Sequence, residues 1–481
     1  MLGKKERGQE ELFVTCRLRD LVPDDYILKR VDKVLDLSWL REEVRDLYDE
    51  AMGRPSIDPE AAVRLMLAGF FHGIVQDRKL MREARMHIGI RWFAGFRLHE
   101  SVPHHSSLTR IRQRWGEERF KRIFEKTVAQ CIAAGLVDGE TVHVDATLIR
   151  ADVSWESLVE RHAEKVLREN ADAPDNDPTD GEAGKRGRPR TREKSPKKIS
   201  RTDPDASLTT SCHSFHMEPS YKQHTAVDDK AGVVVDVAVT TGEQSEGEAL
   251  LVQVERIEAT LGKKIETLTA DAGYAHTANY AALEKRGTDA IIPPQKATVH
   301  KGSIPLRRFK YDAKHRIVRC PAGKSLRRSC AGKNGWWYKA AASDCEACPL
   351  RKRCFSVTAR RRTVLIVDGY ESLLRARRRR GRWSHYEQER YQRHRWRVEG
   401  AHGEAKTQHG LRRAVRRGRW NVAIQAYLTA AVMNLKRLAA LLCLIFLGIW
   451  ARRRGVELVA RRSGRWADHE AACADESRRA A

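Results

Sequence analysis

The order of strand and helix patterns in the middle of the chain constrains its fold more than any other feature. A strand with alternating apolar and polar residues comes first, a hairpin follows, and helices then alternate with strands. The predicted strands are 141–148, 221–227, 233–240, 265–270 and 290–292, and the predicted helices are 250–261 and 277–286. A hairpin combined with crossover helices predicts a mixed α/β sheet.

Two aspartates occupy exposed places on these predicted strands. Asp145 lies on the polar side of the first strand, and Asp271 directly follows the strand 265–270, just before a glycine turn. A carboxylate at the C-terminal edge of a strand is a usual position for an active-site residue of an α/β protein. Either residue taken alone would more often cap a turn or a helix, so the two gain weight only together with a third group.

A third carboxylate stands in a polar stripe near the C-terminus, on a helix predicted from about Ser384 to Gly410. Steps of three and four residues place the members of the stripe on one helix face. These members are Tyr391, Arg395, Glu399, His402 and Lys406. A stripe that packed into a core would be apolar. The charged face therefore favours a functional role.

Three converging carboxylates would form a site for hard divalent cations. Asp145, Asp271 and Glu399 offer only oxygen donors, which suit Mg²⁺ or Mn²⁺. Two such ions can activate a water or a 3′-hydroxyl and stabilise the leaving oxygen of a phosphodiester. Arg395 and Lys406 would then bind phosphates, and Tyr391, on the same face, would contact the DNA backbone.

The charge of the chain favours a polyanionic partner. Ninety Lys and Arg against 64 Asp and Glu give a formal charge of +26. The alternative is a solvated basic surface. Basic blocks with interleaved tryptophans surround Glu399 in sequence, and these tryptophans either stack on unpaired bases or belong to the core. The blocks are 360–362, 377–380 and 412–419, and the tryptophans are Trp383, Trp396 and Trp420.

Residues 1–135 carry helical patterns. Asp58 is placed to cap a helix whose first residue is Pro59. A second helix begins near Ser106, with Leu108, Ile111 and Trp115 on one face. Its arginines at positions 110, 112 and 114 point elsewhere, either toward DNA or toward solvent.

Residues 155–210 are rich in charge and proline and poor in aromatic residues, which predicts a disordered insertion. Within it, the basic segment 185–190 contains Arg188 between Gly187 and Pro189 and resembles an AT-hook. Such a segment lays arginines in a narrow A·T minor groove. Basic linkers also produce this pattern by chance, so both interpretations stay open.

Four cysteines of the segment 300–370 have a spacing that can hold a structural Zn²⁺, although it is looser than a paired zinc ribbon. They are Cys320, Cys345, Cys348 and Cys354. Cys330 is a spare candidate, and the remaining cysteines read as small apolar residues. His213, His216 and His224 near Cys212 could form a second metal site, but a polar loop and strand is the preferred interpretation.

The most apolar run, 438–450, has 13 residues, fewer than the ~20 that a membrane span needs. Basic residues flank it, so it is either a helix on a membrane surface or, as we prefer, a buried helix or partner contact. The first 11 residues are charged, which predicts no secretory signal. Ten cysteines without such a signal predict reduced thiols or metal ligands in a cytoplasm.

Taken together, these motifs resemble the DDE transposases of bacterial insertion sequences. One branch of that family has a Tyr-Arg-Glu-Lys pattern, and the spacing of Arg395, Glu399 and Lys406 is similar to it. Tyr391 departs, because three residues instead of two separate it from Arg395. Segments 53–59 and 91–93 look like the family's N-terminal domain, and 144–147 and 270–274 look like its two aspartate motifs.

The resemblance implies an RNase H-like catalytic core with a disordered insertion and a Cys-rich insertion, preceded by the helical domain. It implies cleavage at terminal inverted repeats and strand transfer into target DNA, by a homodimer that holds two double-stranded ends in a synaptic complex. Such a protein would be cytoplasmic and nucleoid-associated, with no membrane partner. Two alternatives stay open, a metal-dependent nuclease without strand transfer and an inactive derivative that only binds DNA; the intact carboxylates speak against the second.

The sequence therefore predicts the following division of the chain. A helical N-terminal domain for DNA ends precedes the first core strand, the disordered insertion, the rest of the core, the Cys-rich insertion, the helix of the third carboxylate and a basic helical tail. Their bounds are 1–135, 136–154, 155–210, 211–299, 300–370, 371–437 and 438–481.

Overall fold

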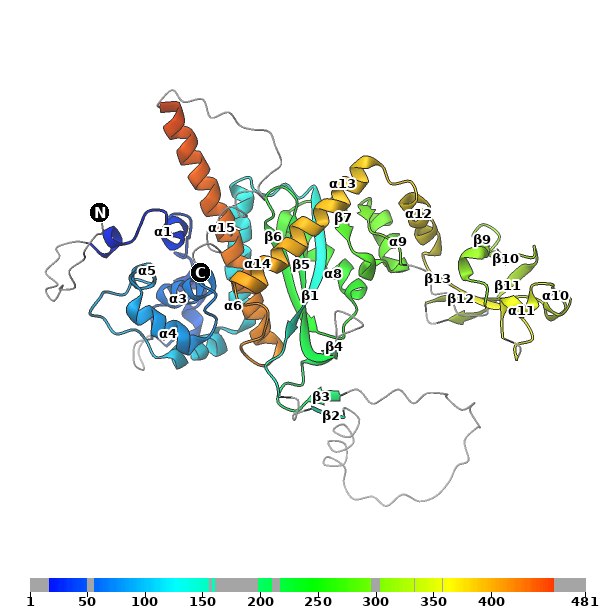
Figure 1. Ribbon diagram of the computed structural model, residues 1–481, viewed down its shortest axis with the longest axis horizontal. Helices are drawn as coiled ribbons and strands as arrows, with labels where there is room; N and C mark the ends of the chain where they lie inside the picture. The colour runs from blue at the N-terminus through cyan, green and yellow to red at the C-terminus, as the bar shows by residue number, and fades with distance from the viewer. Residues whose placement is uncertain are drawn as a thin grey trace, which may run out of the picture.

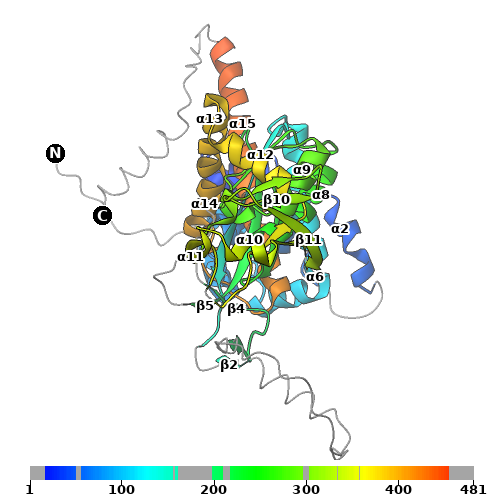
Figure 2. The same ribbon diagram turned by 90° about the vertical axis from the view of Figure 1, so that its right-hand side faces the viewer.

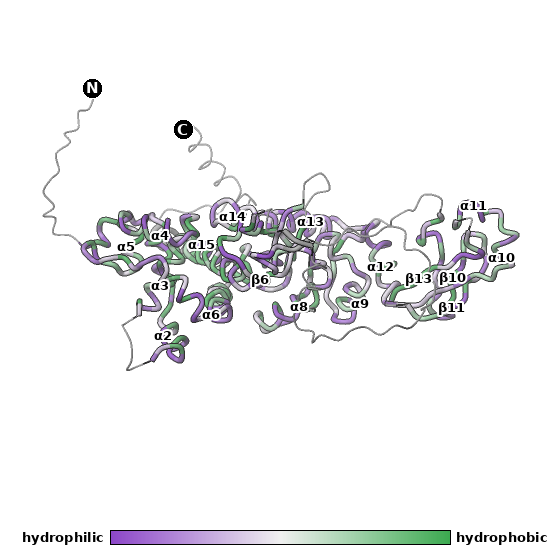
Figure 3. Tube along the Cα trace, turned by 90° about the horizontal axis from the view of Figure 1, so that it is seen from below, coloured by the Kyte–Doolittle hydropathy of each residue, from purple (hydrophilic) through white to green (hydrophobic). Residues whose placement is uncertain are grey.

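Three parts of the molecule follow one another along its long axis: a helical part, a central sheet with its helices, and a small β module (Figures 1 and 3). The structure is a computed structural model. It describes residues 17–49, 56–154, 158–160, 198–209, 217–295, 303–332, 334–356 and 358–453.

The N-terminal part is helical in all its described elements, as predicted. These are η1 (Leu18–Leu21), α1 (Ile27–Asp32), α2 (Leu40–Glu43), η2 (Arg45–Leu47), α3 (Pro59–Phe71), α4 (Asp77–Met86), α5 (Ile88–Phe93) and α6 (His105–Ala133). Asp58 caps α3, because its Oδ1 accepts hydrogen bonds from the backbone of Glu60 and Ala61 at 2.7 and 3.2 Å. Residues 53–55 of the predicted motif lie outside the described residues.

The central sheet confirms the mixed α/β prediction. Its strands are β1 (Thr141–Arg150), β5 (Glu218–Asp228), β6 (Val234–Thr241), β7 (Thr267–Ala270) and β8 (Asp289–Ile291). They lie in the order β6-β5-β1-β7-β8. β5 is antiparallel to both of its neighbours, whereas β1, β7 and β8 are parallel. Helices α8 (Glu246–Leu261) and α9 (Thr277–Arg286) make the crossovers to β7 and β8.

Three short strands within the predicted insertion 155–210 were not anticipated from the sequence. They are β2 (Leu158–Glu160), β3 (Lys198–Ser200) and β4 (Ser207–Thr209). β4 pairs with the first residues of β5, and β3 and β2 continue the sheet beyond it. Pairing with an existing strand end supplies the backbone hydrogen bonds that composition alone did not predict. The AT-hook-like segment lies outside the described residues.

The Cys-rich segment forms a separate β module at one end of the molecule (Figure 1), and this end faces the viewer in Figure 2. Its five antiparallel strands follow in chain order: β9 (Lys310–Asp312), β10 (Ile317–Arg319), β11 (Ser325–Gly332), β12 (Gly335–Lys339) and β13 (Thr363–Val367). The short elements η5 (Leu306–Arg308), α10 (Ala342–Glu346) and α11 (Arg351–Cys354) accompany them. Val318, Leu326, Tyr338 and Val364 are buried, so the module has an apolar core of its own.

The helix that carries the polar stripe is divided into three segments. After α12 (Tyr370–Arg380) come α13 (His385–His394), the π-helical turn η6 (Arg395–Glu399) and α14 (Gly400–Gln408), which run diagonally past the central sheet in Figure 1. Ser384 and Glu387 form a capping box at the start of α13. π turns occur mostly as single turns inside α-helices, frequently at functional sites. Here the turn ends at Glu399.

The C-terminal helix α15 (Arg419–Arg453) joins the helical part to the core. It packs against α6 and against β6. Asn434 is buried on it and exchanges two 2.9 Å hydrogen bonds with the backbone of Val234, which satisfies part of the edge of β6. Helix α15 passes through the predicted boundary between 437 and 438 without a break.

Within the described residues, α15 is also the one helix long and apolar enough to cross a membrane, over Arg419–Leu444. However, 61% of its apolar window is buried inside the molecule. Leu438 and Ala439 are among the buried residues. The start of the apolar run thus packs as a core helix.

Candidate active site

Asp145 and Asp271 lie next to each other on neighbouring parallel strands. Val144 of β1 is in register with Ala270 of β7, so the two aspartates follow at the same level. Asp271 ends β7 because its Oδ1 accepts a 2.8 Å hydrogen bond from the backbone N–H of Gly273 and so caps the next turn. The sheet therefore brings together two carboxylates that are separated by a crossover in the sequence.

The surroundings of Asp145 hold its proton. Burial raises the pKa of Asp145 to about 7, and the charges of Asp271, Glu246 and Glu399 add to that rise. Burial also raises the pKa of Asp271, followed by the charge of Glu246. Glu399 thus lies within electrostatic range of Asp145, and Glu246 within range of both aspartates, so the carboxylates form a cluster of like charges.

Glu399 borders a hollow of about 360 Å³ together with Gln392, Arg395 and Trp396. Its carboxylate is 54% exposed and pairs with Arg395 Nε at 3.4 Å. Such an exposed pair contributes little to stability, so both groups can exchange it for another partner. Among the described residues, no three His, Cys, Asp or Glu side chains stand close enough together to enclose an ion.

His402 and Lys406 of the stripe lie beside Asp145. His402 Nδ1 is 3.6 Å from Asp145 Oδ2, but burial lowers the pKa of His402 to about 3, so the imidazole is neutral and the contact is no ion pair. Burial likewise lowers the pKa of Lys406, and the nearby charge of Asp145 opposes that shift. In the sequence, only its position on the stripe marks His402, whereas in the structure it lies beside the first aspartate.

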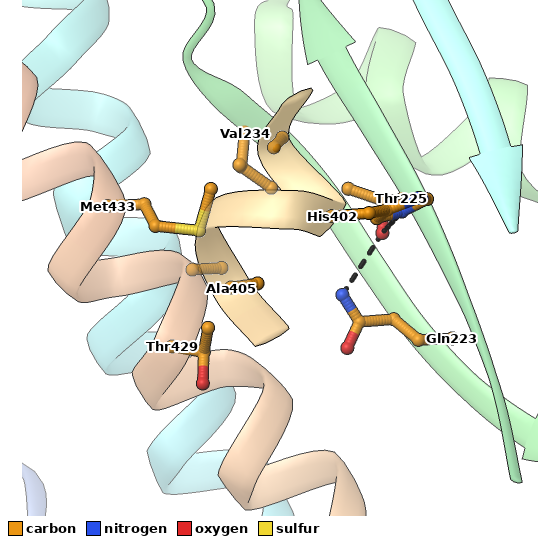
Figure 4. A pocket seen from close by; sticks show the side chains of 9 residues that line it. Gln223, Thr225, Val234, His402, Ala405, Thr429 and Met433 are labelled. Carbon is orange, nitrogen blue, oxygen red and sulfur yellow. Dashed lines mark hydrogen bonds between the residues drawn. The ribbon is translucent and has the colours of Figure 1, made fainter. Parts of the chain in front are cut away.

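Figure 4 shows what holds His402: its ring reaches from α14 to Thr225 of β5, which also binds Gln223. Thr225 Oγ1 lies 3.0 Å from His402 Nε2 and 3.0 Å from Gln223 Nε2. Thr225 is paired with Asp145 in the β1–β5 register. The cavity behind this cluster has a volume of about 10 Å³ and leaves no room for a ligand.

Tyr391 lies at the other end of the stripe. Its ring packs between Trp383, at 5.2 Å, and His394, at 6.0 Å between centroids. Burial raises the pKa of Tyr391, and the charge of Asp271 adds to this rise. The stripe thus follows the acidic cluster from Asp271 to Asp145.

The opposite side of the same helix is fixed to the core by Asp229, which follows β5. Arg390, Arg393 and Arg397 donate to its carboxylate at 2.6, 2.9 and 3.5 Å. His143 Nε2 adds a contact of 3.0 Å. Despite burial, these partners lower the pKa of Asp229 to about 2. This network sets the position of the stripe over the sheet.

Comparisons with known proteins were made with this geometry in hand. A family model described as "Transposase domain (DUF772)" matches residues 16–114, and one described as "Transposase DDE domain" matches residues 319–439, which include Glu399. The residues that these models match are thus transposase domains, the second of them a DDE domain. No curated protein matches it. A cryo-EM structure of a piggyBac transposase synaptic complex with hairpin DNA is 10% identical, covers 90% of this chain and 77% of its own, and has a TM-score of 0.30.

The transposase has three further residues at the acidic cluster that the sequence analysis missed. Glu246 begins α8, Lys222 lies on β5, and Tyr274 ends the turn after Asp271. Lys222 Nζ pairs with Glu246 Oε1 at 3.2 Å. Tyr274 belongs to the quoted motif 270–274 and could have been singled out there. Glu246 had no such pattern, because its role depends on a crossover that brings α8 to the sheet edge.

The arginine blocks of the transposase divide into internal and exposed groups. Arg112 of α6 is buried and binds Asp77 with two hydrogen bonds of 2.8 and 2.9 Å, so it faces neither DNA nor solvent. Arg416 joins the same carboxylate at 2.7 Å. Arg379 pairs with both Asp289 and Glu387. A basic run in the sequence therefore overstates the charge available to DNA.

The tryptophans also divide. Trp383 is buried, and Trp420 is half-buried against the core. Trp396, in contrast, is 70% exposed beside Glu399. The core interpretation holds for the first two tryptophans and is excluded for Trp396.

The four cysteines of the proposed zinc site share one end of the β module. Burial raises the pKa of Cys354, and the charges of Cys345, Cys320 and Cys348 add to the rise, so the thiols are near one another. Cys320 Sγ accepts a 3.3 Å hydrogen bond from the backbone of Lys324. The structure does not gather them at ligand distance. Zinc therefore stays a prediction.

The remaining cysteine and histidine predictions have mixed outcomes. Cys131 is buried as an apolar residue, but Cys443 is exposed, so that prediction is wrong for Cys443. His224 is buried and its Nε2 contacts Thr240 Oγ1 at 3.0 Å, in line with a polar strand position. Its proposed metal partners at 212, 213 and 216, and the cysteines at 16 and 473, lie outside the described residues.

Proposed function

We propose that this transposase binds the terminal inverted repeats of an insertion sequence, cleaves the DNA there and joins the freed 3′ ends to target DNA. Catalysis would use Mg²⁺ or Mn²⁺ held by Asp145, Asp271 and Glu399. One observation carries the proposal: the register of β1 and β7 sets two aspartates side by side, and Glu399 contributes to the raised pKa of Asp145.

The residues fit a divalent cation by their chemistry. The candidate ligands are carboxylate oxygens, which Mg²⁺ and Mn²⁺ prefer. Burial and the neighbouring carboxylates raise the pKa of Asp145 to about 7, so at neutral pH it keeps its proton more readily than an ordinary aspartate. A cation would stabilise the ionised form and lower that pKa, since opposite charge favours a carboxylate. The cluster thus has the property of a site whose counter-charge comes from outside the chain.

The cations would supply activation of the attacking oxygen and stabilisation of the leaving one. The chain's own residues position the DNA. Arg395 is 71% exposed and can leave Glu399 to bind a phosphate, and Lys406 lies on the other side of Asp145. Tyr391 contacts the DNA backbone. The exposed Trp396 offers a face on which an unpaired base stacks.

Cutting and joining two ends in one reaction requires two active sites held together. The proposal therefore includes a homodimer in a synaptic complex, at the bacterial chromosome. Arg188 would add a contact to an A·T-rich minor groove next to the end sequence. Mass photometry of the protein with and without end-bearing duplexes tests the dimer; a 1:1 complex with DNA under cleavage conditions would contradict it.

The central experiment measures cleavage and joining. The full-length protein is mixed with Mg²⁺ and a duplex that carries the end of its element. Asp145→Asn, Asp271→Asn and Glu399→Gln are each expected to lower cleavage by about 10³-fold or more while DNA binding is kept. Glu389→Gln, an exposed carboxylate of the same α13 helix, is the matched control and should cleave normally.

Each outcome separates the alternatives. Undiminished cutting by one of the three variants removes that residue from the site. Nicked DNA without joined products favours a nuclease without strand transfer. Binding without any cutting by the parent protein supports an inactive derivative.

The Cys-rich module is proposed to hold one structural Zn²⁺ through Cys320, Cys345, Cys348 and Cys354. Support comes from their shared position, the mutual effect on the pKa of Cys354 and the backbone hydrogen bond to Cys320 Sγ. Thiolates bind Zn²⁺, and the metal removes the cost of holding several thiolates together.

Metal analysis of the purified protein tests this site. We expect one zinc per chain, loss of that zinc in Cys345→Ser and Cys348→Ser, and a lower melting temperature after chelation. Cys330→Ser, an exposed cysteine of the same module, should keep the metal. A zinc-free protein with an unchanged melt in chelator would reject the site.

A further inference from the structure

A fourth carboxylate, Glu246, faces Asp271 across Gly273. A Cβ atom placed on Gly273 would lie less than 3.0 Å from both Glu246 Oε2 and Asp271 Oδ1. The two carboxylate oxygens are therefore less than 6 Å apart. A glycine at this position leaves open the space between them, which any side chain would fill.

Lys222 pairs with one of the two carboxylate oxygens of Glu246, and the other oxygen faces Asp271. Lys222 Nζ lies 3.2 Å from Glu246 Oε1 and also donates to the backbone oxygen of Gln244 at 2.9 Å. Oε2, the other oxygen, is the one that points to Gly273 and Asp271. The charge of Glu246 raises the pKa of both Asp145 and Asp271. Glu246 thus belongs electrostatically to the same cluster.

Tyr274 gives an independent sign that a ligand is needed here. Its side chain is fully buried, and its hydroxyl has no hydrogen-bond partner among the described residues. Burial raises its pKa, and the charges of Asp145, Glu246 and Asp271 add to that rise, so the phenol lies within electrostatic range of all three. A buried hydroxyl without a partner is costly, which points to water or an ion that completes its bonding.

We propose that Glu246 is a further ligand of the divalent cations of the transposase, and that the Tyr274 hydroxyl bonds to the water that these cations carry. This rests on the proposed function. In the free protein Lys222 stands in for part of the missing charge. The cation and Lys222 then compete for Glu246. Removal of the Glu246 carboxylate should therefore weaken cation binding, whereas removal of the Lys222 ammonium group should strengthen it.

The alternative is a structural ion pair, in which Glu246 only neutralises Lys222. Both views predict some change on mutation, so the test measures cation affinity rather than activity. Mn²⁺ is titrated into the full-length protein without DNA and followed by electron paramagnetic resonance. The variants are Glu246→Gln and Lys222→Met, with Asp145→Asn as reference and Glu248→Gln, an exposed carboxylate in the same helical turn, as control.

Glu246→Gln is expected to weaken Mn²⁺ binding about tenfold or more, as loss of a ligand does, and Glu248→Gln to leave it unchanged. Lys222→Met is expected to strengthen it, because the competing cation is gone. The double variant should bind more weakly than Lys222→Met alone. Equal affinity of the double variant and Lys222→Met would overturn the proposal, as would weaker binding by Lys222→Met.

Tyr274→Phe adds a readout that does not depend on Glu246. Without metal, the melting temperature of Tyr274→Phe should equal or exceed that of the parent, since the variant loses no hydrogen bond within the protein. The rise in melting temperature on adding Mn²⁺ should be smaller in Tyr274→Phe than in the parent. Tyr280→Phe is the matched control, because its hydroxyl donates to Ile292 O at 2.9 Å and its loss should lower the melt at any metal concentration. If Tyr274→Phe has a lower melting temperature than the parent in the absence of metal, the proposed bond between the Tyr274 hydroxyl and cation-bound water is rejected.

The same titration separates this proposal from the proposed function. If Asp145→Asn weakens Mn²⁺ binding and Glu246→Gln does not, Glu246 is no ligand and the three-carboxylate site stands. If neither variant changes Mn²⁺ binding, both proposals fail.

Discussion

Two aspartates of the central sheet, the buried Asp229 and the partly buried Asp145, have opposite surroundings. Asp229 is surrounded by three arginines and a histidine, and its pKa is lowered to about 2. Asp145 is surrounded by Asp271, Glu246 and Glu399, and its pKa is raised to about 7. Both belong to the β1–β5 region of the sheet and both contact the same long helix, so burial alone does not explain the difference.

The difference separates a carboxylate that the fold neutralises from one that we propose to bind a cation. The chain supplies the counter-charge of Asp229 and thereby fixes the helix. For Asp145 it supplies only Lys406, whose own pKa burial lowers, next to a neutral histidine and several like charges. A cluster that the fold leaves with excess negative charge is where an external cation gains most.

The largest stability effect should follow removal of the Asp229 charge. Asp229→Asn leaves Arg390, Arg393 and Arg397 partly buried without their partner, which costs about 3–5 kcal/mol. Urea unfolding measures the loss. Asp289→Asn breaks an ion pair with Arg379 that is about 40% exposed and should cost less than ~1 kcal/mol. Equal losses of unfolding free energy in Asp229→Asn and Asp289→Asn would show that the Asp229 network holds the helix no more strongly than an exposed ion pair.

The two aspartates should also give opposite dependences of stability on pH. The raised pKa of Asp145 stabilises the fold below its unfolded value near 3.8, and this contribution is lost as pH rises through about 7. The lowered pKa of Asp229 contributes stability above about 3.8 and loses it as pH falls through about 2.

Melting curves from pH 4 to 8 in chelator test this. Asp145→Asn should gain stability relative to the parent as pH rises, and saturating Mg²⁺ should remove that gain. Both proteins contain the same buried histidines, such as His394, whose pKa burial lowers to about 3. The contribution of these histidines therefore cancels when the stability of the variant is subtracted from that of the parent. If the difference in stability between Asp145→Asn and the parent does not change with pH, the pKa of Asp145 is not raised.

A smaller effect distinguishes two arginines of the same helix region. Arg395→Ala should change unfolding stability by less than about 0.5 kcal/mol but weaken cleavage by the equivalent of about 1.5–3 kcal/mol, the value of a charged hydrogen bond to phosphate. Arg393→Ala should do the reverse, because Arg393 is bound to Asp229 at 2.9 Å. Stability assays and cleavage rates on one duplex measure both; the same pattern in both variants would contradict the assignment.

Sequence patterns predicted the core well where local residues decide the structure. Alternation found β1, Asp58 and Pro59 marked the start of α3, and Gly287 marked the end of α9, where it adopts a left-handed conformation. The patterns missed β2, β3 and β4, which form by pairing with a strand end far along the chain. Local propensity cannot show such a partner.

The stripe was predicted as one α-helical face, and its π turn was not. A π turn takes up one residue more than an α turn, and the segment just before Arg395 holds one residue more than the family pattern. In space Tyr391 still lies by Asp271.

By itself, the sequence determined the types and spacing of the chemical groups: Asp145, Asp271 and Glu399 with the cations around them. These depend on residue identity and on the short-range periods of strand and helix. Tertiary structure alone decided which charges each carboxylate meets. It bound Asp229 to arginines, left Asp145 among acids and brought in Glu246 and Tyr274, because a carboxylate's pKa depends on burial and on neighbours that only the folded sheet assembles.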